Sequence, residues 1–344
     1  MKKKQNKEWS KHLSTIITDP DLQIGQTPRK LVWRKNKTTL WYYPTREKKF
    51  QTPLFLIYSL VNKSYILDLY PGMSMIEAFL KEGYDVYLLD FGEPGYEDKN
   101  LTLDDYILKY IDKGVKRALL HANVEEMSVI GYCLGGTLTA IYLAIASAPI
   151  KNVVLFAAPI DFENFQNHWK ESLKNNNMNR NIHEIIDAYG IIPGKVVEGA
   201  LRLVTSPFSY SSYLYLLQKS ADEKAILKWR LLNKWLKDPV PFPGATLKQL
   251  IEDLGISNKL VNNKLAIDGK KVDLTNIEAN TLVIATTDDQ IVPEHLTKPI
   301  MDLISSKDKT FARIKGGHVS IAMTGKIPEV LQEWLSQRSN QFKK

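Results

Sequence analysis

The sequence of 344 residues has very little cysteine, since Cys133 is its only one. A single cysteine excludes an intramolecular disulfide and a structural zinc site built from several cysteines. Glycine and proline, with 18 and 16 residues, are too few for a collagen-like or low-complexity chain. Because 44% of the residues are hydrophobic and 24% are charged, we expect a globular protein with a full core.

The N-terminus lacks the apolar run of a secretory signal, because the lysines at 2–4 are followed by the polar segment 8–12. The uncharged stretch 127–150 is long enough to span a bilayer. However, it begins with a β-rich segment and contains three glycines, which indicates a buried strand, turn and helix. We therefore expect a soluble, cytoplasmic protein without a transmembrane segment.

The charge is mildly basic, with 46 Lys and Arg against 38 Asp and Glu, a formal net charge of +8. Part of the excess lies at the two ends, in 1–7 and 343–344, where it is typical of solvated tails. A basic excess also favours anionic partners such as a phosphorylated substrate. No basic stripe interleaved with aromatic residues occurs, so we expect no nucleic-acid partner.

Apolar runs of strand length alternate with segments of helical periodicity. The runs are 53–59, 84–90, 127–132, 152–158, 280–286 and 309–314. Ser74 and Glu77 have capping-box spacing for a helix that ends near Gly83, and Thr102 is placed as the N-cap of the apolar stripe 103–119. This alternation predicts a mostly parallel, doubly wound α/β sheet.

The pattern changes from about residue 161 to residue 272, where the chain becomes polar, aromatic and helical in character, with a loop-like run at 174–179. Insertions of this length in a compact fold are usually functional. We therefore predict a cap or lid over 161–272. The core is expected to comprise 26–160 and 273–344, preceded by a basic N-terminal segment, 1–25.

The sharpest local signal is Gly-Tyr-Cys-Leu-Gly-Gly at 131–136, between a predicted strand and a predicted helix. It fits the nucleophile-elbow pattern with cysteine in place of serine, and its glycines leave room for a sharp turn. The helix N-terminus would stabilise a thiolate on Cys133 and an oxyanion at the Leu134 amide. Taken alone, the motif is equally consistent with a buried structural cysteine, whereas its spacing fits neither a dinucleotide site nor a P-loop.

Two further candidate residues follow predicted strands in the order nucleophile, acid, histidine that α/β-hydrolases use. The acid is Asp289 or its neighbour Asp288, and the base is His318. Asp161 is an alternative candidate for the triad acid, but its Asp-Phe-Glu context is more typical of a structural residue. The loop 59–63 should supply the second oxyanion donor, for which we choose Val61. The other histidines are expected to be core or surface residues: His12, His121, His168, His183 and His295.

At these motifs the sequence resembles the polyhydroxyalkanoate synthases. The segment 132–137 looks like the lipase-like box of that family, and 62–69 and 86–90 match its segments in and around the first strands. Ile-Val-Pro two residues after Asp289 matches the family's acid motif, which favours Asp289 over Asp288, and His318 matches its histidine motif. Gln290 stands where the family usually has histidine.

The resemblance covers about residues 26–338. The short chain and Asp-Gly-Lys-Lys-Val-Asp-Leu at 268–274 are similar to the catalytic subunit of the two-subunit classes, closest to the Bacillus-type class. This resemblance implies an α/β-hydrolase fold and an acyltransferase that polymerises (R)-3-hydroxyacyl-CoA, chiefly 3-hydroxybutyryl-CoA, into polyester and releases coenzyme A.

In such an enzyme Cys133 would be the nucleophile and His318, oriented by Asp289, its base, with Leu134 and Val61 as oxyanion donors. Asp289 acting directly on the incoming hydroxyl is a variant. No cofactor or metal is implied, because coenzyme A is part of the substrate. The implied partners are a small PhaR-like or PhaE-like companion subunit, the growing polyester at the granule surface, and a second copy or hetero-oligomer. Two rival hypotheses are a cysteine thioesterase or depolymerase with the same triad, and a non-enzymatic granule-associated scaffold.

Overall fold

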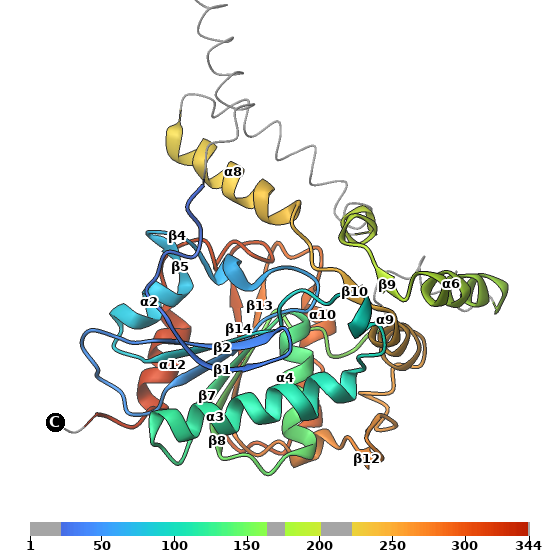
Figure 1. The fold of residues 1–344 in the computed structure, drawn as a ribbon. Helices are drawn as coiled ribbons and strands as arrows, with labels where there is room; N and C mark the ends of the chain where they lie inside the picture. Colours follow the sequence, from blue (N-terminus) through green and yellow to red (C-terminus); the bar gives the residue numbers. More distant parts are fainter. Residues whose placement is uncertain (1–21, 164–175, 201–221, 343–344) are drawn as a thin grey trace, which may run out of the picture.

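A computed structural model describes residues 22–163, 176–200 and 222–342 of the chain. Its centre is an eight-stranded sheet of order β1-β2-β6-β3-β7-β8-β13-β14 (Figure 1). The strands are β1 (Lys30–Lys35), β2 (Thr38–Tyr43), β3 (Leu54–Ile57), β6 (Val86–Asp90), β7 (Met127–Tyr132), β8 (Ile150–Phe156), β13 (Asn280–Thr286) and β14 (Lys309–Ile314). The six strands from β6 to β14 in this order run parallel, which confirms the predicted sheet.

The hairpin of β1 and β2 was not predicted. It is antiparallel and joins β6 at the edge of the sheet. None of the residues of β1 is buried, and the turn contains Asn36 with a φ of 52°. An exposed edge strand lacks the continuous apolar run by which the central strands are recognised.

The helices that flank the sheet are α2 (Met75–Lys81), η3 (Asp105–Ile111), α3 (Asp112–Ala122), α4 (Leu134–Ile145), α10 (Glu294–Thr297), α11 (Ile300–Leu303) and α12 (Glu329–Arg338). Successive side chains of a central strand pack into two different hydrophobic clusters, one on each face of the sheet. Phe55 packs in the cluster of η3, α3 and α4, whereas Leu54 and Leu56 pack in the cluster of α2 and α12. Both faces of the central strands are therefore buried, as their continuous apolar sequence requires.

The helix starts follow the predicted capping residues in part. The Ser74 hydroxyl accepts the Glu77 N–H at 3.0 Å, but the Glu77 carboxylate accepts the Gly72 N–H at 2.8 Å and not that of Ser74. Only half of the predicted capping box is therefore formed. Thr102 is confirmed as an N-cap, because it accepts from the Asp105 N–H and donates its own N–H to the Asp105 carboxylate. The π-helical turns of η3 were not predicted, because the apolar spacing fits an α-helix equally well.

Between β8 and β13, no described residue adds a strand to the large sheet. This part contains α6 (Asn176–Tyr189), β9 (Ile191–Ile192), α8 (Glu223–Leu236), β10 (Phe242–Pro243), α9 (Gly244–Gln249), η4 (Leu250–Ile256), β11 (Ala266–Ile267) and β12 (Lys270–Lys271). In Figure 1, α8 lies above the sheet and α6 projects to one side. The loop expected at 174–179 is wrong from 176 onward, where α6 begins. Of the predicted N-terminal segment 1–25, residues 1–21 lie outside the described residues.

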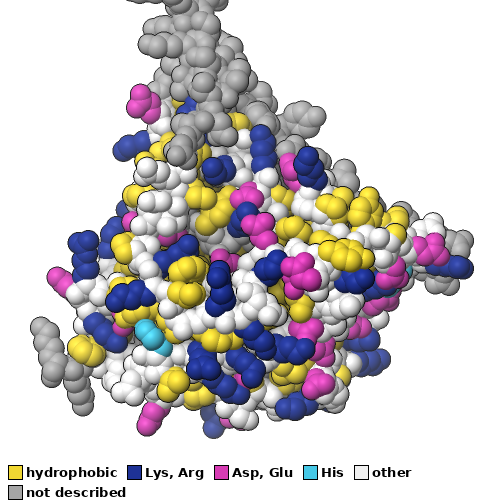
Figure 2. Space-filling view, viewed as in Figure 1, with side chains coloured by type: hydrophobic (Ala, Val, Ile, Leu, Met, Phe, Trp, Pro, Cys, Tyr) yellow, Lys and Arg dark blue, Asp and Glu magenta, His cyan; other side chains and the backbone are white. Residues whose placement is uncertain are grey.

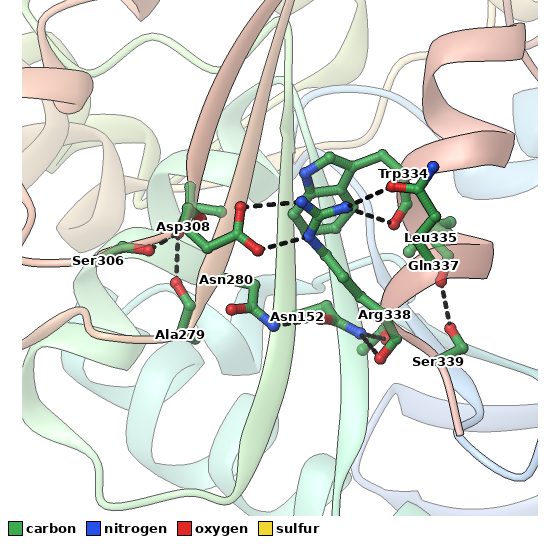
Figure 3. Close-up of polar contacts among 12 residues, drawn as sticks. Asn152, Ala279, Asn280, Ser306, Asp308, Trp334, Leu335, Gln337, Arg338 and Ser339 are labelled. Carbon is green, nitrogen blue, oxygen red and sulfur yellow. Dashed lines mark hydrogen bonds and ion pairs between the residues drawn. The ribbon is translucent and has the colours of Figure 1, made fainter.

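Polar contacts tie α12 to the amino ends of β8, β13 and β14 (Figure 3). Arg338 donates two parallel hydrogen bonds to Asp308, at 2.7 and 2.9 Å, and its guanidinium lies 4.6 Å from the centre of the Trp334 ring. Asn152 donates to the Arg338 carbonyl and accepts from Asn280. In the part of the chain that is described, no helix is long and apolar enough to cross a membrane.

Candidate active site

Cys133 occupies a strained turn between β7 and α4, with φ 54° and ψ −131°. A side chain at positive φ is costly, and such strain persists only where the surroundings enforce it. Here the Cys133 N–H donates to the Phe156 carbonyl at 2.9 Å, and the Cys133 carbonyl accepts the Gly136 N–H at 2.8 Å. The backbone thus adopts the sharp strand-to-helix turn that the motif predicts.

The three glycines of the turn lie where no side chain fits. A Cβ on Gly135 would lie 2.3 Å from the Ile57 carbonyl oxygen, and one on Gly131 would lie 2.5 Å from the Thr139 hydroxyl. A Cβ on Gly136 would meet the side chain of residue 158 at 2.4 Å. The glycine pattern is therefore a packing requirement of the elbow, which brings α4 against β3 and β7.

Leu134 is the first residue of α4, so its N–H has no carbonyl partner within the helix. The partly exposed Cys133 side chain begins from the same turn. A negative charge at this point would be stabilised by the helix N-terminus and by the free N–H.

Asp289 is buried, and its carboxylate is surrounded by hydrogen-bond donors. One oxygen accepts the N–H groups of Ile291 and Val292, at 2.9 and 2.8 Å. The other accepts the Thr286 hydroxyl at 3.2 Å and lies 2.7 Å from Nδ1 of His318. Asp288 is exposed. The structure therefore brings Asp289, and not its neighbour, to the histidine.

His318 is buried and lies between Asp289 and Cys133. Burial lowers its pKa, but the charge on Cys133, together with hydrogen bonds to Asp289 and Cys133, outweighs burial and raises that pKa to about 10. Since Nδ1 faces Asp289, Nε2 is the ring nitrogen left for the cysteine. The structure thus brings the three residues chosen from the sequence together: the His318 ring contacts the Asp289 carboxylate, and its pKa responds to the charge on Cys133.

Tyr132 supports the histidine through a contact that the sequence does not predict. Its buried hydroxyl donates to the His318 carbonyl, and its ring stacks on Phe156 at 4.6 Å between centroids. The residue precedes the nucleophile in the elbow motif, but nothing in the sequence indicates the partner of its hydroxyl.

Val61, the expected second oxyanion donor, has its N–H directed to the Ser59 hydroxyl at 3.2 Å. Its carbonyl accepts the Val240 N–H at 3.0 Å, and the Trp235 indole donates to the Lys63 carbonyl at 2.9 Å. The end of α8 and the segment that follows it therefore bind the loop 59–63. A catalytic role of the Val61 N–H stays a prediction.

The remaining candidates lie apart from these three residues. Asp161 accepts the Asn258 amide at 2.7 Å and the Glu163 N–H at 2.8 Å. His121 contacts the Tyr87 hydroxyl, His183 contacts Glu252, and His295 and Gln290 are exposed, whereas His12 and His168 lie outside the described residues. Within the ranges that the structure describes, no cluster of three or more His, Cys, Asp or Glu side chains could hold a metal ion.

Two family models match the sequence, that of the alpha/beta hydrolase fold over residues 52–182 and that of the N-terminus of poly-beta-hydroxybutyrate polymerase (PhaC) over residues 12–79. A poly(3-hydroxyalkanoate) polymerase subunit PhaC from Synechocystis sp. is 30% identical over 94% of this chain and 88% of its own length. The chain belongs to the PhaC family of poly(3-hydroxyalkanoate) polymerase subunits.

A second PhaC subunit, from Haloferax mediterranei, is also 30% identical over 94% of this chain, which spans 66% of that protein. Among solved structures, the putative non-heme bromoperoxidase BpoC from Mycobacterium tuberculosis matches with a TM-score of 0.51 and 15% identity, over 89% of this chain and 96% of that one. Such a likeness shows the fold alone, which is the predicted α/β-hydrolase fold. The resemblance to the PhaC family and the enzyme class expected from it, an acyltransferase of polyhydroxyalkanoate synthesis, are confirmed.

Proposed function

We propose that this chain is the polymerising subunit of a synthase that uses (R)-3-hydroxyacyl-CoA, chiefly the short-chain 3-hydroxybutyryl thioester. The observation that carries the proposal is the connected arrangement of Cys133, His318 and Asp289 at a nucleophile elbow, with 2.7 Å between the histidine and the carboxylate. The names of the PhaC relatives support the reaction class.

In the first half of the reaction, Nε2 of His318 takes the proton of the Cys133 thiol. The thiolate attacks the thioester carbonyl carbon, and the bond to the coenzyme A sulfur breaks. The imidazolium then returns its proton to the departing coenzyme A thiolate, which leaves an acyl-cysteine. The Leu134 N–H, and the Val61 N–H once it turns away from Ser59, would hold the oxyanion.

In the second half, His318 removes the proton from the 3-hydroxyl of the next unit, and that oxygen attacks the acyl-cysteine. An ester bond forms, the carbon–sulfur bond breaks, and the thiolate regains a proton from the histidine. A thioester keeps the acyl group activated for this attack. Both Asp289 oxygens already accept hydrogen bonds, so the carboxylate is better suited to orienting His318 than to acting directly as the base.

Polymerisation needs an active site from which water is excluded, because water on the acyl-cysteine would yield a thioesterase. Leu231 and Trp235 of α8 are buried in the same cluster as Tyr58 and Tyr132, and Cys133 packs against it. This packing supports a role for the insertion 161–272 as a cap over the nucleophile.

The same proposal includes a small PhaR-like or PhaE-like companion subunit, assembly as a homodimer or hetero-oligomer, and a location at the surface of cytoplasmic polyester granules. The term "subunit" in the relatives' names supports a companion. No cofactor is required, because each step above uses only the chain's own side chains and the substrate.

Trapping the acyl-enzyme tests the proposed chemistry. Brief mixing with (R)-3-hydroxybutyryl-CoA, acid quenching and peptide mass analysis should place a hydroxybutyryl group on the peptide that contains Cys133. The His318→Gln variant is the matched control and should accumulate little of this adduct. Turnover by the wild type with the acyl group on another residue, or on none, would contradict the proposal.

A further inference from the structure

The segment that carries His318 has no regular secondary structure. It follows β14, and residues 315–328 belong to no helix or strand. Asp289 contacts the imidazole at Nδ1, which fixes one side of the ring and not the backbone behind it. Because a loop backbone shifts more readily than a strand, the distance from Nε2 to the Cys133 sulfur depends on what holds residue 318 in place.

Tyr132 makes a contact that holds this backbone. Its hydroxyl donates a hydrogen bond to the His318 carbonyl, although the two residues lie 186 positions apart in the chain. Tyr132 is the last residue of β7 and directly precedes Cys133. A single side chain therefore joins the strand that ends at the nucleophile to the backbone of the base.

The ring of Tyr132 is packed against three other rings. Tyr132 is the register partner of Phe156 on β8, and their rings stack at 4.6 Å between centroids, with 12° between the planes. The Tyr58 ring lies 5.6 Å away, and the His318 ring lies edge-on at 6.0 Å. This packing fixes the direction in which the hydroxyl points. Since the Phe156 carbonyl also accepts the Cys133 N–H, one residue holds both the ring and the nucleophile.

The contact between Tyr132 and His318 is buried. The two residues are 2% and 9% exposed, whereas the lysine and arginine side chains gathered on the face in Figure 2 lie at the surface, where water competes for their contacts. Burial raises the pKa of Tyr132, and the charges on Asp289 and Cys133 raise it further. The phenol therefore keeps its proton and remains a donor. A buried carbonyl that loses its donor carries a free-energy cost.

We propose that Tyr132 is a positioning residue for the reaction: its hydroxyl holds the His318 backbone at the separation from Cys133 at which Nε2 can take and return the thiol proton. This inference rests on the proposed function for the roles of Cys133 and His318. An aromatic residue before the nucleophile is then not sufficient, because phenylalanine would keep the stacking and lose the contact with the histidine.

The Tyr132→Phe variant tests this role, because it removes only the hydroxyl. It should lower kcat for coenzyme A release by about tenfold to a hundredfold and leave KM unchanged, since a displaced base slows the chemical step and not substrate binding. Tyr84→Phe is the matched control. Tyr84 is also buried, stacks on Phe50 at 4.2 Å with 12° between the planes, and donates to the Ser339 hydroxyl at 3.3 Å, at the end of α12. This control should lose comparable stability and keep the wild-type kcat.

The pH profile of alkylation by iodoacetamide gives a second readout that needs no substrate. Cys133 is the only cysteine, so the rate of alkylation reports on its thiolate alone. The titratable groups that face it are His318, Tyr58 and Tyr132, and Asp289 faces the histidine. Because burial raises the pKa of both phenols, a shift in the profile reports on the histidine. Tyr132→Phe should move the midpoint to higher pH, since a displaced imidazolium stabilises the thiolate less.

Tyr84→Phe should leave the alkylation midpoint at the wild-type value. A Tyr132→Phe variant that forms polymer with the wild-type kcat and midpoint would overturn the inference and leave the proposed function intact. Lower activity with an unshifted midpoint would also overturn it, because the hydroxyl would then contribute only to the stability of the fold. A shifted midpoint in a chain that forms no polymer from hydroxybutyryl-CoA would support the positioning role and refute the synthase.

Discussion

The two ends of the central sheet use the same kinds of side chain in different ways. At the carboxyl ends, Asp289 and His318 form a pair whose side chains are 0% and 8% exposed, beside the strained backbone of Cys133. At the amino ends, Asp308 and Arg338 form a pair whose side chains are 39% and 20% exposed, beside ordinary helical backbone. Burial and strain, and not the presence of an ion pair, distinguish the candidate active site.

This difference follows from what each pair contributes. Partly exposed pairs add little stability, and buried pairs must offset the desolvation of both partners. A buried carboxylate and imidazole beside a strained nucleophile are therefore a poor stabilising device, whereas they are well placed to move a proton. The Arg338 pair acts instead as a tie between α12 and the sheet (Figure 3).

The largest expected effect comes from removing the nucleophile. Cys133→Ala should lower the rate of coenzyme A release by at least about 10⁴-fold, by analogy with other nucleophile deletions. The melting temperature should change little, because alanine keeps the Cβ and meets the same backbone strain. Release near the wild-type rate would remove Cys133 from the mechanism.

The next largest effect is expected from breaking the buried pair of Asp289 and His318. Asp289→Asn keeps the shape but loses the charge that orients His318, so the rate should fall by about 10² to 10⁴. The rate of coenzyme A release, measured at the same substrate concentration for both proteins, gives the loss. The equivalent change at the amino ends of the strands, Asp308→Asn, should leave this rate unaltered. Equal rates in Asp289→Asn and the wild type would mean that the carboxylate is only structural.

The raised pKa of His318 also predicts a pH dependence of stability. The charge on Cys133, followed by the hydrogen bond to Asp289, raises the folded-state pKa of His318 above the unfolded value of 6.5. The stability contributed by the protonated imidazole is therefore complete below pH 6.5 and is lost as the pH rises through about 10. Wild-type stability should therefore decline over this window relative to His318→Gln. NMR titration of the imidazole would check the direction, which a pKa below 6.5 would contradict.

A smaller effect tests the packing of the elbow. Gly135→Ala places a Cβ against the Ile57 carbonyl and should lower the free energy of unfolding by about 1–3 kcal/mol, with loss of activity. Gly199→Ala is the matched control, because a Cβ there meets no atom of the described residues within 4 Å. Chemical denaturation of both variants would separate local crowding from a general effect of alanine.

The smallest effect is expected at the amino ends. Arg338→Gln should lower the free energy of unfolding by about 0.5–1 kcal/mol, because the pair with Asp308 is partly exposed. Its kcat should equal that of the wild type. A large loss of activity would show that the two ends of the sheet are coupled.

Much of the fold could be predicted because each central strand is a buried apolar run, as in 127–132 and 280–286, whose bounds the structure reproduces. The edge strand β1 was missed because it has no buried residue and therefore no such run. The π-helical turns of η3 were missed because side-chain spacing does not record the hydrogen-bond register.

The candidate site was predictable where a backbone constraint leaves its mark in the sequence. The glycines around Cys133 reflect contacts below 3 Å that any Cβ would make. By contrast, the bond from Tyr132 to the His318 carbonyl and the attachment of Val61 to Val240 join segments far apart in the chain. No local pattern encodes such pairings, so only the structure identifies them.

Whether this chain polymerises its substrate is decided by following coenzyme A release from (R)-3-hydroxybutyryl-CoA and turbidity in the same cuvette, with and without a Bacillus-type companion subunit. The proposed polymerase activity predicts release accompanied by insoluble polyester, and dependence on the companion would place the chain in a two-subunit class. Release that yields only free hydroxybutyrate, with a clear solution under both conditions, would contradict it and indicate a hydrolase.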